Sequence, residues 1–348
     1  MGEASGAGST RAVTLRDVAQ LAGVHPGTVS RALNEATRPL VNAETTRRVL
    51  DAAEKLKYRP NPIARGLKTN RSRTVGVIVP DLLNPLFAAI VRGIEARLDR
   101  DGYTLLITNT DNDPDRERTQ FEAMLARQVD GFITATAHRD HRLITEVVGP
   151  DAKVVLVNRR ADDNALPAVT VDDERGVRLT VAHLVELGHR RIAQLSGPSR
   201  LSTGMRRRQG FVAAMAERGL DVDPELLDSG DGFTEAEGAR VCRDLIGRGV
   251  PFTAIVAGND LMALGCLDAL DEVGLRCPED VSIVGFNDIP FAGRFRPPLT
   301  TVRIPHYELG ATAGGLLLDM LRGEDVGRRQ ILLDPELIVR ESTAPPAP

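Results

Sequence analysis

The segment TLRDVAQLAGVHPGTVSRALN, residues 14–34, decides how the N-terminal part of this chain folds. Apolar side chains recur at helical spacing from Leu15 to Ala22, and the Thr that opens the segment is a good helix cap. Gly23 ends this helix, and a second helix begins near Pro26, whose fixed φ suits the first helical position. Two short helices joined by a tight glycine-containing turn predict a helix-turn-helix.

The surface of the second helix is suited to DNA. A third helix, expected from about Ala43 to Leu56, closes a small core with the first two. Polar side chains on the outward face of the second helix can then reach base edges and phosphates in a major groove. A three-helix bundle without a role in DNA binding is the alternative, but its surface would carry a mixture of Glu and Lys. The candidate DNA contacts are His25, Thr28, Ser30 and Arg31, with Asn34 at the end of the helix.

A second candidate DNA element is the segment NPIARGLK, residues 61–68. It has a cap, a proline start and barely two helical turns, and Gly66 costs it about 1 kcal/mol relative to Ala. Such a helix is expected to form only with support from a partner copy and a DNA groove. Leu67 is a candidate minor-groove wedge, and Arg65 and Lys68 are candidate DNA contacts beside it. An ordinary linker is the alternative.

Charge is divided unequally along the chain. Residues 1–73 contain 13 Lys and Arg against 6 Asp and Glu, whereas the remaining residues contain 31 against 42. The first part has a net charge of +7 and the second of −11, within a total of −4. A small basic head on an acidic body indicates a polyanionic partner for the head alone.

From Thr74 onward, short apolar runs alternate with helical stretches. Strands are expected at TVGVIVP, YTLLITN, VDGFITA and KVVLVN, with helices at 88–100 and 116–127. The rhythm restarts after Pro167, with strands at RIAQLS, TAIVA and VSIVGF and helices ending near Leu187 and spanning 205–217, 235–246 and 261–273. Continuous apolar strands between helices predict two doubly wound, parallel-sheet lobes in an α/β body behind the all-α head.

Amide or carboxylate side chains follow five of the expected strands. Ligands bind at the carboxyl ends of parallel strands, so these side chains would form a rim suited to a hydroxylated ligand. Asn and Asp also cap helices and make turns, which leaves each position open to a purely structural explanation. The residues are Asn84, Asn109, Asn158, Asn259 with Asp260, and Asn287 with Asp288.

Composition and motifs argue against several other classes of protein. No stretch approaches the roughly 20 apolar residues that span a bilayer, and the small, polar residues 1–10 do not predict a secretory signal. Cys242, Cys266 and Cys277 lack paired spacing and are expected to be free thiols in a reducing cytoplasm. No nucleotide-binding glycine motif, P-loop or nucleophile elbow is found, and His138 and His141 have no third metal ligand nearby. Neither catalysis, a cofactor nor a metal is expected.

The head as a whole resembles a known family. TLRDVAQLAGVHPGTVSRALN and YRPNPIARGLKTN resemble the head of the LacI/GalR family of bacterial repressors, and the resemblance continues to about residue 343. It implies that the second helix reads an operator half-site and that a paired hinge helix opens the minor groove with Leu67. Pro26 and Gly27 match the family's variable base-reading pair, but neither side chain has a donor or acceptor, so discrimination falls on neighbouring contacts and DNA shape. His25 replaces the Ser that usually caps this helix.

The body resembles the same family through PDLLNPLF, AGNDLMALG, PEDVSIVGFND and PPLTTVR. These motifs imply the periplasmic-binding-protein fold with a sugar-like effector between the lobes, and Arg207 matches the principal ligand-binding arginine. Position 287 is Asn where the family often has Asp, so ligand preference cannot be copied from a sugar-binding relative. The implied effector contacts are Asn84, Phe87, Asn158, Arg207, Phe233, Asn259 and Asn287.

The sequence therefore predicts one function and a defined order of parts. Residues 1–10 and 344–348 are expected to be disordered tails, 11–59 a DNA-binding domain, 60–73 a hinge and linker, and 74–343 the effector-binding and dimerisation domain. A homodimer is expected because two-fold operators mirror two-fold proteins. The expected protein is a cytoplasmic transcription repressor that binds double-stranded DNA and has no membrane partner. An exported solute-binding protein or a sugar-processing enzyme is the alternative.

Overall fold

The computed structural model describes residues 13–347, apart from Ala36, 60–70, His141 and Pro150, and it divides into two compact units. Unit 1 comprises residues 1–72 and unit 2 residues 73–348. The tail predicted for residues 1–10 and the helix predicted for residues 61–68, with Arg65, Leu67 and Lys68, lie outside the described residues.

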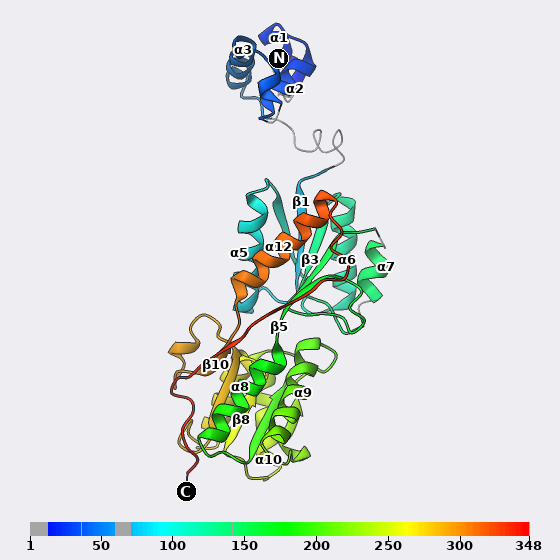
Figure 1. Ribbon diagram of the computed structural model, residues 1–348. Helices are drawn as coiled ribbons and strands as arrows, with labels where there is room; N and C mark the ends of the chain where they lie inside the picture. Colours follow the sequence, from blue (N-terminus) through cyan, green and yellow to red (C-terminus); the bar gives the residue numbers. More distant parts are fainter. Residues whose placement is uncertain (1–12, 36, 60–70, 141, 150, 348) are drawn as a thin grey trace, which may run out of the picture. The chain divides into compact units, whose positions relative to one another are not determined.

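Unit 1 is a small three-helix domain (Figure 1). Its helices are α1 (Leu15–Ala22), α2 (Pro26–Leu33) and α3 (Ala43–Lys55), with a 3-10 turn η1 (Arg38–Leu40) between the last two. Val18, Val29 and Val49, one from each helix, are fully buried and form the centre of the core. The sequence thus predicted all three helices, and the structure adds the 3-10 turn.

The ends of α1 and α2 are fixed by local hydrogen bonds. Thr14 and Asp17 form a capping box, in which the Asp17 carboxylate accepts from Thr14 N at 2.7 Å. Gly23 ends α1 in the left-handed conformation, with φ 65°. His25 is the N-cap of α2, because its Nδ1 accepts from Gly27 N at 3.1 Å. His25 therefore caps α2 through its own side chain.

The first lobe of unit 2 is a six-stranded sheet with two helices on each face (Figure 1). Its strands run in the order β11-β5-β4-β3-β1-β2, and every pairing is parallel. Val75, Val77 and Val79 on β1 face α5 and α12, whereas Ile78 faces α6 and α7. The strands are β1 (Thr74–Val79), β2 (Thr104–Asn109), β3 (Gly131–Thr134), β4 (Val154–Val157), β5 (Ala168–Val171) and β11 (Gln330–Leu333), and the helices are α5 (Pro85–Asp99), α6 (Pro114–Ala126), α7 (Arg142–Val148) and α12 (His306–Arg322).

The second lobe repeats this plan, with strand order β12-β10-β9-β8-β6-β7. Helices α8 and α9 cover one face of the sheet and α10 and α11 the other, and only β12 runs antiparallel to its neighbour. Short 3-10 turns η2 (Pro224–Leu226) and η3 (Ala292–Arg294) lie in its loops. The strands are β6 (Ile192–Ser196), β7 (Leu227–Ser229), β8 (Ala254–Ala257), β9 (Ser282–Asn287), β10 (Thr300–Arg303) and β12 (Glu336–Ile338), and the helices are α8 (Asp173–Glu186), α9 (Ser202–Glu217), α10 (Glu235–Gly247) and α11 (Asp260–Glu272).

The two-lobed α/β class is confirmed, but the lobes are not consecutive halves of the chain. β5 follows Pro167 yet belongs to the first lobe, and α12 and β11 return to that lobe after β10. Strands β5, β7 and β10–β12 were not predicted from the sequence. No helix in the described part of the chain is long and apolar enough to cross a membrane.

The end of the chain also differs from its prediction. Ala344 N donates to Ser282 Oγ at 3.0 Å, and Ala344 O lies 2.9 Å from His189 Nε2. The prediction that disorder begins at residue 344 is therefore wrong for Ala344, whose backbone is held on the second lobe. No apolar pattern marks this tail, so its sequence gives no sign of the contact.

Close packing of α5 against α12 depends on glycine. A Cβ on Gly310 would lie 1.9 Å from Ile90 O, and one on Gly93 would lie 2.1 Å from Tyr307 O. Each helix therefore approaches the backbone of the other where it has no side chain. These glycines lower helix propensity, which explains why α12 was not predicted.

We expect Gly310→Ala to destabilise unit 2 by about 1–3 kcal/mol, because helix backbones must separate to admit the methyl group. Gly315→Ala is the matched control on the same helix, since its Cβ would meet nothing closer than Arg97 Nε at 3.7 Å. The control is expected to be neutral or up to about 1 kcal/mol stabilising. Denaturant unfolding of both variants measures the difference, and equal midpoints would contradict the packing argument.

Candidate functional site

In unit 1, the polar face of α2 is left open. Only Val29 and Ala32 of this helix are buried, while Arg31 is exposed and makes no ion pair with the residues described around it. Its helix is held in place by Arg38, whose Nε donates to Ala32 O at 3.0 Å. The remaining predicted contacts lie on the same helix or at its ends, with His25 exposed and Pro26, Gly27, Thr28, Ser30 and Asn34 half-buried. The face can therefore present one free guanidinium and several small polar groups to a ligand.

In unit 2, a cavity that is open to solvent at its mouth lies between the two lobes. It is lined from the first lobe by the β1–α5 and β4–β5 loops, and from the second by the loops before α9, α10 and α11 and by the end of β9. All seven predicted effector contacts line this one cavity: Asn84, Phe87, Asn158, Arg207, Phe233, Asn259 and Asn287. The strand-end rule selected Asn84, Asn158, Asn259 and Asn287, which are spread over some 200 positions of sequence, and the family resemblance supplied the other three.

Two of the lining amides also perform the structural role that the sequence left open. Asn84 caps α5 by accepting from Leu86 N at 3.1 Å, and Asn259 caps α11 by accepting from Met262 N at 2.8 Å. Asn259 Nδ2 additionally donates to Phe233 O at 3.2 Å. Capping therefore fixes these side chains at the cavity wall, so the structural and binding explanations are compatible.

Arg207 is far more enclosed than its sequence context suggests. It is 4% exposed, its Nε donates to Asp173 Oδ1 at 2.7 Å, and its Nη1 donates to Gly258 O at 2.6 Å. Its guanidinium carbon lies 3.7 Å from the centre of the Phe286 ring and 5.7 Å from that of Phe233. The side chain is thus neutralised and sandwiched, and only part of its donor set faces the cavity.

Three buried polar groups of the lining residues have no hydrogen-bond partner in the described part of the chain. They are Thr203 Oγ1, Asn287 Oδ1 and Arg159 Nε, in side chains that are 3%, 2% and 4% exposed. Asn287 also has φ 118°, a strained backbone conformation for a residue with a side chain. Unsatisfied groups and strain at a cavity wall are typical of a binding site that a ligand completes.

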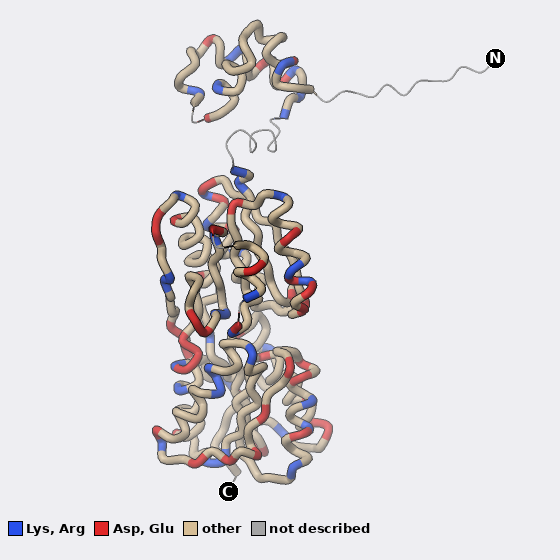
Figure 2. Tube along the Cα trace, turned by 90° about the vertical axis from the view of Figure 1, so that its right-hand side faces the viewer, with Lys and Arg blue, Asp and Glu red and all other residues tan. Residues whose placement is uncertain are grey.

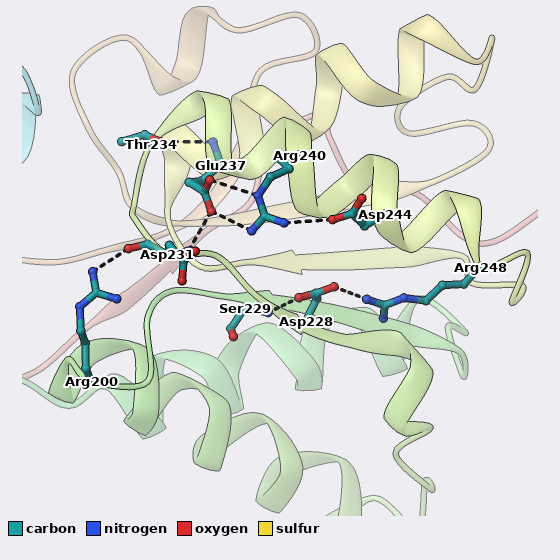
Figure 3. A network of polar contacts seen from close by, with 9 residues as sticks. All are labelled: Arg200, Asp228, Ser229, Asp231, Thr234, Glu237, Arg240, Asp244 and Arg248. Carbon is teal, nitrogen blue, oxygen red and sulfur yellow. Dashed lines mark hydrogen bonds and ion pairs between the residues drawn. The ribbon is translucent and has the colours of Figure 1, made fainter.

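The loop that carries Phe233 is restrained from both sides (Figure 3). Arg200 Nη2 donates to Asp231 O at 2.7 Å, and Asp231 N donates to Glu237 Oε2 at 2.8 Å. Arg240 anchors Glu237 in turn, and this pairing lowers the pKa of the Glu237 carboxyl. The Phe233 ring packs so closely over Gly197 that a Cβ there would lie 2.1 Å from it. The Phe233 ring is therefore held at the cavity by its packing on Gly197 and by the hydrogen bonds that restrain its loop.

The same region connects the lobes. Arg139, which follows β3 in the first lobe, donates through its backbone N to Arg200 O at 3.1 Å and through Nη1 to Ser199 O at 3.3 Å. Asp162 holds the Arg139 guanidinium in this position at 2.7 Å. A movement of one lobe would consequently pull on the segment that supports Phe233.

Three of the predicted strand-end residues do not line the cavity. Asn109 Oδ1 accepts from Leu82 N at 2.9 Å, and Asp288 pairs with Arg303 and Arg340. Asp260 is fully buried and accepts from Ile289 N at 2.7 Å, and burial raises its pKa to about 7. These side chains build the loops around the cavity instead of facing it.

Sequence reasoning missed several lining residues. Arg159 directly follows Asn158, so the strand-end rule already pointed to its position. Arg200 precedes α9 and Thr203 lies in its first turn, in a stretch without any apolar pattern. Asp173, the partner of Arg207, follows β5, a strand that was itself not recognised.

Metal chemistry has no support in the residues that the structure describes, among which no group of three His, Cys, Asp or Glu side chains could hold an ion. Cys242 and Cys266 are buried free thiols, and Cys277 is a half-buried one. His138 lies in this described part, whereas His141 lies outside it.

Comparison with protein families matches both units. Residues 14–61 match the bacterial regulatory proteins of the lacI family, and residues 181–343 match a periplasmic binding protein-like domain. Among similar sequences, the HTH-type transcriptional repressor CytR of Escherichia coli K12 is 38% identical over 332 residues, which span 95% of this chain and 96% of that protein. The HTH-type transcriptional repressor PurR of Aliivibrio fischeri MJ11 is 34% identical, over 94% and 98% of the two chains.

Solved structures show the same likeness in three dimensions. The lac repressor dimer bound to operator and the anti-inducer ONPF has a TM-score of 0.86 and 29% identity, covering 96% of this chain and all of that one. The complex of the transcriptional regulator CelR with cellobiose has a TM-score of 0.71 and 32% identity, covering 95% and 99%. Both the head and the two-lobed body therefore have counterparts along nearly the full length of known regulators.

Proposed function

This chain belongs to the LacI family of bacterial regulatory proteins, and from that membership we propose that unit 1 binds an operator with an affinity that a small molecule in the interlobe cavity changes. The chain is a DNA-binding transcriptional regulator, not an enzyme. The observation that carries the effector part is the convergence of seven separately encoded side chains on one cavity.

The DNA contacts that we propose are those of α2 and its ends, from His25 to Asn34, with Arg31 as the principal charged group. Arg31 is exposed and forms no ion pair with the described part of unit 1, so it is available to a phosphate or a guanine edge. Pro26 and Gly27 bring backbone close to the groove but supply no side-chain donor. We therefore expect readout to depend strongly on DNA shape.

The effector contacts that we propose are the seven side chains of the cavity, and the ligand is a polar metabolite of sugar-like size. Amide groups that both donate and accept suit hydroxyl groups, and the Phe87 and Phe233 rings suit the faces of a ring. The lac repressor of the related structure is a dimer bound to operator, and we propose that this chain likewise acts as a homodimer on a pseudo-palindromic site in the cytoplasm.

A mobility-shift titration on DNA flanking the gene tests this function. We expect the full chain to protect a two-fold symmetric site, and one metabolite of a screened pool to change its affinity by about 5–150-fold, the usual range of allosteric coupling. A scrambled duplex of the same length and composition is the control. Equal affinity for both duplexes would contradict operator recognition.

A further inference from the structure

Resting on that proposed function, we propose that the effector carries an anionic group, a carboxylate or a phosphate, which Arg159 binds. Arg159 lines the cavity directly after Asn158, at the end of β4. The sequence pattern drew attention to the amide and left the guanidinium without a role.

The contacts of Arg159 leave one edge of its guanidinium unused. Nη1 donates to Asn112 Oδ1 at 3.1 Å, which is an amide and not a carboxylate. Nε has no hydrogen-bond partner among the described residues, although the side chain is only 4% exposed. No carboxylate of the described residues forms an ion pair with this arginine. The Nε–Nη2 edge has the fork geometry that grips two oxygens of one anion.

The protein supplies only a weak counter-charge to this arginine. Glu117 is the carboxylate whose charge acts on Arg159, but its Oε1 accepts a short hydrogen bond from Thr136, and it forms no ion pair with the residues that the structure describes. Burial raises the pKa of the Glu117 carboxyl. Burial likewise lowers the pKa of Arg159 to about 10, as expected for a guanidinium without a close partner.

The other charged residues at the cavity do not supply the counter-charge that Arg159 lacks. Arg207 is already neutralised by Asp173, and Arg200 donates to a backbone carbonyl, not to a carboxylate. Asp81 and Asp231 line the cavity from half-buried and exposed positions, where water screens them. Asn287, 2% exposed, supplies an uncharged amide at the end of β9.

A buried charge without a partner is costly, and a bound anion removes that cost. The anion would meet Arg159 along its free edge and could accept a further bond from the unpartnered Thr203 hydroxyl. A neutral polyol would leave the guanidinium uncompensated. The cavity should therefore prefer an acid or a phosphate ester to the corresponding neutral compound.

Inorganic phosphate titrated into the full-length protein at constant ionic strength is the direct test, read out by thermal unfolding. We expect saturable stabilisation whose apparent Kd rises at least tenfold in Arg159→Gln and changes less than twofold in Arg160→Gln. The second variant removes the same charge one residue away, at a side chain that does not line the cavity. Arg159→Lys keeps the charge but loses the fork, and we expect an intermediate loss. This variant keeps the test decisive if the glutamine variant folds poorly.

Competition identifies the source of the anion. D-Glucuronate and D-glucose 6-phosphate are added against bound phosphate, with D-glucose as the neutral match, and displacement by either acid supports the proposal and distinguishes carboxylate from phosphate. Three results would overturn it: no saturable effect of phosphate, equal effects in wild type and both glutamine variants (an adventitious ion only), or tighter binding of glucose than of both acids. Operator shifts by wild type and Arg159→Gln are run in parallel. Intact operator binding without an anion site would overturn this inference alone, whereas absent operator binding would overturn the proposed function.

Discussion

Removal of residues 1–73 is expected to abolish DNA binding altogether. These residues carry a net charge of +7, whereas the remainder carries −11 and would repel a polyanion. Because Lys and Arg contacts to phosphates release counterions, the affinity of the full chain should fall steeply with salt, with a log–log slope of about −0.9 for each phosphate neutralised. Fluorescence anisotropy of a labelled operator duplex measures both proteins over a salt series.

Cooperative unfolding and ligand response serve as controls that the truncated protein is folded. Unit 2 is compact by itself and contains the entire interlobe cavity, so residues 74–348 should unfold cooperatively and keep their ligand response. Figure 2 shows acidic and basic residues interspersed along the Cα trace of unit 2. Salt-dependent binding by the truncated protein, with an affinity comparable to that of the full chain, would show that the DNA-binding surface does not lie in unit 1.

Replacement of Arg207 by Met is expected to have the second-largest effect, on both stability and sensing. The substitution leaves Asp173 buried without its partner, which typically costs about 3–5 kcal/mol. It also removes a charge-assisted contact to the effector worth about 1.5–3 kcal/mol, so effector affinity should fall about 10- to 100-fold. Denaturant unfolding and calorimetry measure the two effects separately.

A paired variant distinguishes the two roles of Arg207. Arg207→Met combined with Asp173→Leu removes both charges of the pair, so most of the lost stability should return, because an apolar pair of similar volume is often as stable as a buried ion pair. Effector binding should remain lost. If the single variant is as stable as wild type, the ion pair is not structural. If it binds effector normally, Arg207 does not contribute to the binding site.

The sequence predicted where the site residues lie better than it predicted what surrounds their side chains. Asn84, Asn158, Asn259 and Asn287 each follow an apolar strand, and parallel strands end at a common edge, so their convergence follows from sequence pattern. The same rule also selected Asp260, which points into the second lobe and never reaches the cavity. A strand-end rule gives the edge but not the direction of each side chain.

The features that the sequence did not predict depend on contacts between residues that are far apart along the chain. Asp173 and Arg207 are 34 residues apart on two helices, and nothing in either local sequence announces the pair. The return of α12 to the first lobe depends on Gly93 and Gly310 meeting the opposite backbone, a contact that exists only once both helices are placed. By helix propensity alone such glycines are unfavourable within a helix, whereas in the folded protein they allow the two helices to pack closely.

The central claim is that one chain couples DNA reading to ligand sensing, and calorimetry of effector binding with and without saturating operator tests it most directly. The metabolite identified in the mobility-shift screen is titrated into the full-length protein in both states. Because coupling between two sites is reciprocal, the operator should change effector affinity by the same factor by which the effector changes operator affinity. Effector affinity that is identical with and without operator, despite an effector-dependent mobility shift, would contradict the account.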